Sequence, residues 1–123
     1  LHDIGIKESE RKYQSSAARY QEQEGPPVAR EILLKLGAAE DLVEEVCDII
    51  GHHHHPRTTE TINFKCLYDA DLLVNLEEQR KEKPVEPERL EGIIRKAFLT
   101  ESGKKLAQEI LLIGTRLKIQ ESD

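Results

Sequence analysis

The chain has 123 residues, of which 37% are apolar, 4% aromatic and 34% charged, and its formal net charge is −6. This length suits one domain, and the negative charge argues against a protein that wraps nucleic acid through its phosphates. No run approaches the roughly 18 to 20 apolar residues that span a bilayer, and no signal-peptide pattern is present, so we expect a cytoplasmic protein without a membrane partner.

The helical spacing of the apolar residues predicts an all-α fold, a compact bundle of about five to six helices. Gly5 predicts the end of a helix that begins upstream, with His2 and Asp3 in its last turn. Residues 7–23 are polar and predict a loop with a short helix.

Five further segments complete the predicted bundle. Pro26 and Pro27 suit the first turn of a helix that Gly37 ends, and residues 38–53 predict the next helix, which begins with acidic residues. Thr58 or Thr59 is expected to cap the following helix, with Glu60 in its first turn. Its predicted buried face is Ile62, Cys66, Leu67, Ala70, Leu73 and Leu76. Residues 82–87 predict a surface linker, and two last helices are expected around 88–98 and 100–118.

The two cysteines, Cys47 and Cys66, lie far apart without a CxxC pattern, inside stretches that are typical of buried helix faces. We therefore predict reduced core residues rather than a disulfide.

Three features place metal-ligating side chains where the local pattern is apolar. They are His2-Asp3, the run His52 to His55 at a helix end, and Asp69 with Asp71 inside a hydrophobic helix. A buried carboxylate needs a cation or strong donors, so Asp71 among Leu and Ala indicates a divalent metal. Imidazole and carboxylate ligands without thiolates suit Mn, Fe, Co, Ni, Zn or Mg.

Each feature also has an ordinary explanation when it is taken alone. A His-Asp pair occurs by chance, and a histidine run can be a solvated loop. Asp69 is interpreted as a second-shell or solvent-facing acid, because only one of two residues so close on a helix points straight at the same ion. The combination of the three features favours the metal site.

The order of these features resembles the HD superfamily of metal-dependent phosphohydrolases. The residues that carry the resemblance are Leu1-His2-Asp3-Ile4-Gly5, the helix that ends in His52-His53, and Asp69-Ala70-Asp71-Leu72. The resemblance covers residues 1–76, whereas the helices at 88–118 carry no motif. It implies one HD-like domain over residues 1–123.

The resemblance also implies a ligand set. His2, Asp3 and Asp71 correspond to three of the four ligands of the family's first metal. The fourth is a histidine from an upstream helix that this sequence does not contain, so we expect the chain to be part of a longer protein. For a second metal, His52 and His53 match one position, His54 matches it less closely, and Glu24 stands where the family has another histidine.

The expected chemistry is hydrolysis of a phosphomonoester or nucleotide by a water that the metal activates. Asp3, His52 and His53 are the expected catalytic residues, with a neutral histidine orienting the substrate or protonating the leaving oxygen. His54, like Asp69, is expected to support the ligands rather than to bind the ion directly. The basic residues nearest in sequence to the motifs are expected to bind the phosphate, and they are Lys7, Arg11, Lys12, Arg57 and Lys65.

Two alternatives stay open at this point. One is a regulatory domain that senses a nucleotide without turnover, and the other is a di-iron oxygenase on the same scaffold. The expected partner is a small phosphorylated substrate, and a homodimer is left open.

Overall fold

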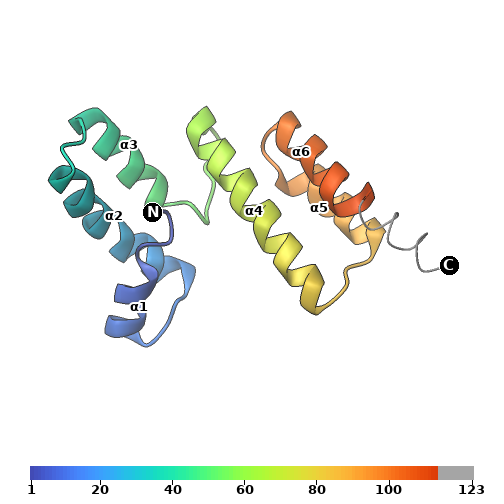
Figure 1. Ribbon diagram of the computed structural model, residues 1–123, viewed down its shortest axis with the longest axis horizontal. Helices are drawn as coiled ribbons and strands as arrows, with labels where there is room; N and C mark the ends of the chain where they lie inside the picture. Colours follow the sequence, from blue (N-terminus) through green and yellow to red (C-terminus); the bar gives the residue numbers. More distant parts are fainter. Residues whose placement is uncertain (114–123) are drawn as a thin grey trace. The chain divides into compact units, whose positions relative to one another are not determined.

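The computed structural model describes residues 1–113, and these form six α-helices and a π-helix without any strand, so the all-α prediction is confirmed. The chain divides into two compact units, Leu1–Glu60 (unit 1) and the residues from Thr61 onward (unit 2) (Figure 1). No helix among residues 1–113 is long and apolar enough to cross a membrane.

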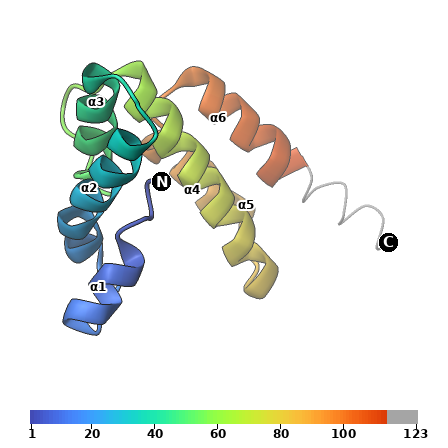
Figure 2. The ribbon, with the colours of Figure 1, turned by 60° about the vertical axis from the view of Figure 1, so that its left-hand side comes forward.

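Unit 1 contains three helices, α1 (Ile6–Tyr13), α2 (Ala18–Lys35) and α3 (Glu40–Ile50). The central helix α2 packs against both α1 and α3, as both ribbon views show (Figures 1 and 2). Residues three and four apart on α2 and α3 supply the apolar core of this unit. Its buried members are Ala29, Leu33, Val43, Cys47 and Ile50.

The N-terminal segment differs from its prediction. Residues 2–5 form turns instead of the last turn of a helix, and Gly5 is the N-cap of α1 rather than a helix end. Ile4 N donates to Leu1 O at 3.0 Å and Ile6 N donates to Asp3 O at 3.1 Å. Asp3 therefore lies on a tight turn directly before a helix.

The helix α2 begins eight residues before the predicted prolines, so Pro26 and Pro27 lie inside it. Neither proline has an N–H to donate to the preceding turn. Packing of α2 on two neighbouring helices offsets this loss, and sequence pattern alone does not report such packing. The predicted end at Gly37 is confirmed, since this residue has φ +76° and its N–H bonds to Leu34 O in a Schellman motif.

The helix that follows α3, α4 (Ile62–Glu82), starts later than predicted. Its N-cap is Thr61, whose side chain accepts from Phe64 N at 3.2 Å, rather than Thr58 or Thr59. Glu60 consequently lies before the helix, and its carboxylate contacts the loop that leads back to α3.

Unit 2 contains α4 (Ile62–Glu82), α5 (Pro87–Ala97), α6 (Glu101–Ala107) and the π-helix Gln108–Ile113. The linker is confirmed between α4 and α5, with Pro87 in the first turn of α5. The predicted helix 100–118 changes to a π-helix at Gln108, and positions 114–118 of that prediction lie outside the described residues. The buried core is Leu76, Leu90, Ile94, Phe98, Ala107, Leu111 and Leu112.

The predicted buried face of α4 is confirmed at Leu76 and in part at Leu73, but it is wrong at its start. Ile62 is 65% exposed and Cys66 is also exposed, so the expectation of a core cysteine holds for Cys47 alone. Asp69 and Leu76 are buried, and Leu72 and Leu73 between them pack partly against the core of unit 2. A carboxylate thus occupies the buried stripe, which the apolar pattern by itself does not predict.

Candidate metal centre

The turn that carries His2 and Asp3 lies against α2 through two glycines. A Cβ on Gly5 would lie 2.5 Å from Gln21 O and 2.7 Å from Gly25 N, and a Cβ on Gly25 would lie 2.6 Å from Ile50 Cγ2. These positions leave no room for a side chain. The two glycines therefore let the Asp3 turn approach α2 at backbone distance.

The histidine run forms a turn at the end of α3, and α2 holds it from the other side. His55 N donates to His52 O at 2.9 Å, which closes the turn. Glu22 accepts from His54 N at 3.0 Å and from His55 Nδ1 at 2.7 Å. The Gln21 side chain lies 3.0 Å from His54 Nε2. The histidines are thus fixed by residues about 30 positions earlier in the chain.

His53 is buried with one ring nitrogen unsatisfied. Its side chain is 2% exposed, and Nδ1 lies 2.8 Å from Ile50 O. Because a carbonyl only accepts, Nδ1 carries the hydrogen, and the neutral ring then has its lone pair on Nε2. Among residues 1–113, His53 Nε2 is the buried side-chain polar atom without a hydrogen-bond partner. Burial of an unsatisfied polar atom is costly, so a missing partner is indicated.

A carboxylate oxygen lies near His53 Nε2, but the distance between them is too long for a hydrogen bond. Asp3 Oδ1 lies 3.6 Å from His53 Nε2, beyond hydrogen-bond range. Two ligands of one tetrahedral ion with bonds of about 2.1 Å are about 3.4 Å apart. The separation therefore fits two ligands of a shared cation better than a direct contact.

His54 offers a third ligand. Asp3, His53 and His54 each offer a ligand atom, and these atoms all lie within 4.8 Å of one another. One carboxylate oxygen with two imidazole nitrogens is a donor set that Mn, Fe, Co, Ni and Zn accept. We call these three residues the Asp3 triad.

His2 lies beside this triad. Its Nε2 is 3.2 Å from Asp3 Oδ2, and its ring meets the His53 ring edge to face with centroids 5.5 Å apart. The structure of unit 1 thus brings together four of the predicted site residues, His2, Asp3, His53 and His54.

Two other predicted ligands in unit 1 have different neighbours. His52 contacts Asp48 O through Nδ1 and Glu60 through Nε2. Glu24 accepts from Lys12 Nζ and from the Tyr13 hydroxyl, both at 2.9 Å. These two donors outweigh the effect of burial and lower the pKa of Glu24. Neither residue belongs to the Asp3 triad.

The predicted phosphate-binding residues are spread over both units. Lys7 is exposed on α1, Arg11 is paired with Glu8 at 2.8 Å, and Arg57 is paired with Asp48 at 3.2 Å. Lys65 lies on α4 of unit 2.

Asp71 also lies on α4, where its Oδ1 accepts from Asn75 Nδ2 at 3.3 Å.

Asp69, expected in the second shell or facing solvent, is buried in unit 2 and accepts three hydrogen bonds there. Leu99 N, Thr100 N and Thr100 Oγ1 donate at 2.8, 2.9 and 2.6 Å. A buried carboxylate needs a cation or strong donors, and Asp69 has three such donors. These hydrogen bonds join α4 to the start of α6.

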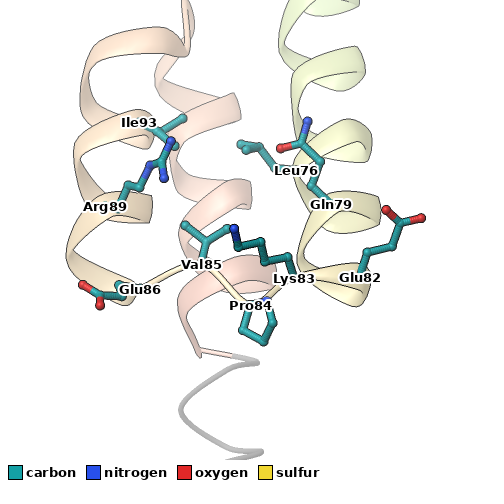
Figure 3. Close-up of a pocket in the computed structure, with 9 residues that line it drawn as sticks. All are labelled: Leu76, Gln79, Glu82, Lys83, Pro84, Val85, Glu86, Arg89 and Ile93. Carbon is teal, nitrogen blue, oxygen red and sulfur yellow. The ribbon is translucent and has the colours of Figure 1, made fainter.

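Unit 2 contains a groove that is lined by residues 76–93, outside the motifs. It has a volume of about 510 Å³ and is formed by the end of α4, the linker and α5 (Figure 3). Apolar Leu76, Val85 and Ile93 lie among acidic and basic side chains, and no predicted site residue lines the groove.

The sequence identifies the candidate metal ligands but not the residues that hold the histidine run in place. Gln21 and Glu22 fall in a segment predicted as loop, and Glu60 was expected in a helix. The sequence gives no signal for the close contact at Gly25, because Gly25-Pro26-Pro27 suits the start of a helix equally well.

Comparison with protein-family models, with curated proteins and with solved structures finds no match to this chain.

Proposed function

We propose that this chain is a metal-dependent phosphohydrolase that acts on a phosphomonoester or a nucleotide. The observation that carries the proposal is the buried, unpaired Nε2 of His53 at 3.6 Å from Asp3 Oδ1. An imidazole lone pair and a carboxylate at this spacing are complementary to a divalent cation.

Each residue of the centre has a distinct part in this proposal. Asp3, His53 and His54 hold the ion, and the Ile50 carbonyl keeps His53 in the tautomer that leaves Nε2 for binding. His2, beside Asp3, orients the phosphate or protonates the leaving oxygen.

A bound divalent cation supplies a Lewis acid for a phosphoryl oxygen and activates water as the nucleophile. The Asp3 carboxylate is 48% exposed, so one side of the centre is open to solvent and to an anionic substrate. The chain carries a net charge of −6, and Lys7 on the first turn of α1 is the exposed basic residue nearest in sequence to Asp3. We propose that the positive charge of Lys7 attracts the phosphate of the substrate to the centre.

The test uses the 123-residue chain with Mn²⁺ and measures bound metal and the phosphate released from p-nitrophenyl phosphate and nucleoside 5′-monophosphates. We expect His53→Ala to lose both metal binding and turnover. The matched control is Glu44→Gln, which removes a surface carboxylate of unit 1 that is paired with Arg30 at 2.7 Å, and it should leave both intact.

Three results would decide against the proposal or narrow it. Equal metal binding by wild type and His53→Ala would refute the assigned centre. Metal binding without phosphate release would favour the regulatory alternative. Bound iron with a redox-active spectrum would favour the oxygenase.

A further inference from the structure

His52 and His53 are adjacent in the sequence but have different kinds of partner. His53 keeps Nε2 unpaired, whereas both ring nitrogens of His52 contact protein atoms. Nδ1 of His52 lies 2.6 Å from Asp48 O, and Nε2 lies 2.9 and 3.1 Å from the two oxygens of Glu60. The His52 ring is therefore held at both ends.

Glu60 has a second contact, on the backbone. Its Oε2 accepts from Arg57 N at 2.7 Å, and its side chain is 6% exposed. Burial raises the pKa of Glu60, but the Arg57 N–H and the His52 ring outweigh this effect, so the pKa is lowered and the carboxylate stays ionised. A single buried carboxylate thus joins the first and last parts of the loop 52–60.

The position of His53 depends on the same backbone. His52 N donates to Ile49 O at 3.2 Å, and His53 Nδ1 donates to Ile50 O at 2.8 Å. Because the peptide between His52 and His53 sets the direction of both side chains, a contact that fixes the His52 ring also limits the orientation of His53.

We propose that Glu60 is a positioning residue for the metal centre: by holding His52 and closing the loop 52–60, it keeps His53 Nε2 directed toward Asp3. This inference rests on the proposed function. It assigns His52 to the support of its neighbour, in place of the ligand role that the sequence resemblance implies.

The test is a titration of the 123-residue chain with Co²⁺, followed by its visible absorption, which reports ligand geometry. The variants are Glu60→Gln, His52→Ala, the two combined, and His53→Ala. The matched control is Glu44→Gln, which removes another carboxylate of unit 1, paired with Arg30 at 2.7 Å on the surface.

We expect Glu60→Gln to weaken Co²⁺ binding by roughly tenfold, the lower end of the range for residues that support a ligand. At saturating Co²⁺ its spectrum should differ from that of wild type, which a mere loss of stability would not cause. His52→Ala should weaken binding similarly, and the double variant should lose little more, because the two residues act as one unit. The control should match wild type.

Failure of the inference and failure of the proposed function give different results. If His53→Ala loses Co²⁺ but Glu60→Gln binds it like wild type, the positioning role is overturned and the centre stands. If His52→Ala abolishes binding while Glu60→Gln does not weaken it, His52 is a ligand and the inference is wrong. If wild type binds no Co²⁺, both fail.

Folding of each variant is checked by circular dichroism. If Glu60→Gln is unfolded, Glu60→Asp replaces it. Its shorter side chain keeps the charge but does not span both His52 Nε2 and Arg57 N, so it must bind Co²⁺ more weakly than wild type. Binding equal to wild type would overturn the inference.

Discussion

The contact between the Asp3 turn and α2 can be tested with a single methyl group. Gly5→Ala would place a Cβ 2.5 Å from Gln21 O, 2.7 Å from Gly25 N and 2.9 Å from Gly25 Cα. Real Cβ atoms do not come within 3.0 Å of such neighbours, so the turn and the helix must separate by several tenths of an ångström. All three atoms belong to the backbone of α2, which a rotamer change cannot move away.

The size of the effect follows from overpacking. Adding a methylene-sized group to a tight interior costs about 1–3 kcal/mol. In a unit of 60 residues, a loss of 1 kcal/mol in the free energy of unfolding lowers the melting temperature by about 4–8 °C. We therefore expect Gly5→Ala to lower the melting temperature of unit 1 by roughly 4 to 24 °C. Because the same separation moves Asp3 away from His53, Co²⁺ affinity should also fall.

The assay is thermal unfolding followed by circular dichroism in the presence of a chelator, with Co²⁺ affinity measured separately at 25 °C. Gly92→Ala is the matched control, because its Cβ meets nothing within 4 Å inside α5. There alanine should stabilise by about 1 kcal/mol through helix propensity. A Gly5→Ala chain that melts like wild type would refute the close approach of the turn to α2.

Three further predictions concern Asp69, Glu24 and the two cysteines. Asp69→Ala leaves three donors near Thr100 without their buried acceptor, so we expect a loss of about 2–4 kcal/mol, measured by urea unfolding; an unchanged midpoint would contradict the structural role. The pKa of Glu24 is lowered in the folded chain, so its stabilising effect is complete above the unfolded value of 4.5 and is lost as the pH falls through the folded value. Stability should therefore fall less between pH 7 and pH 3 in Glu24→Gln than in wild type, and equal losses would count against the Lys12 and Tyr13 contacts. With a thiol reagent, exposed Cys66 should react at once and buried Cys47 only on unfolding, and two fast thiols would disprove the assigned burial.

The sequence predicts the helical class and several helix ends correctly because these depend on local chemistry. Gly37 ends α2 through its positive φ, and α5 begins at Pro87, one residue before the predicted start, because the proline ring suits a first turn. The choice of His2, Asp3 and the histidine run as candidate ligands also follows from residue type, since imidazoles and carboxylates in an apolar context need a partner.

The tertiary structure decides what local pattern leaves open. Pro26 and Pro27 lie inside α2 because packing on α1 and α3 offsets the two lost hydrogen bonds. Asp69 rather than an apolar residue lies on the buried stripe of α4, because donors 30 residues later satisfy it.

The histidine run shows most clearly which features residue type predicts and which features tertiary contacts decide. The sequence resemblance ranks His52 and His53 together and His54 after them, but partners distant in the sequence give these side chains different roles. Glu60 and Asp48 occupy both nitrogens of His52, while the Ile50 carbonyl leaves His53 Nε2 unpaired near Asp3. The direction of a side chain is set by the groups that hold its ring and its backbone, and only the folded chain brings those groups together.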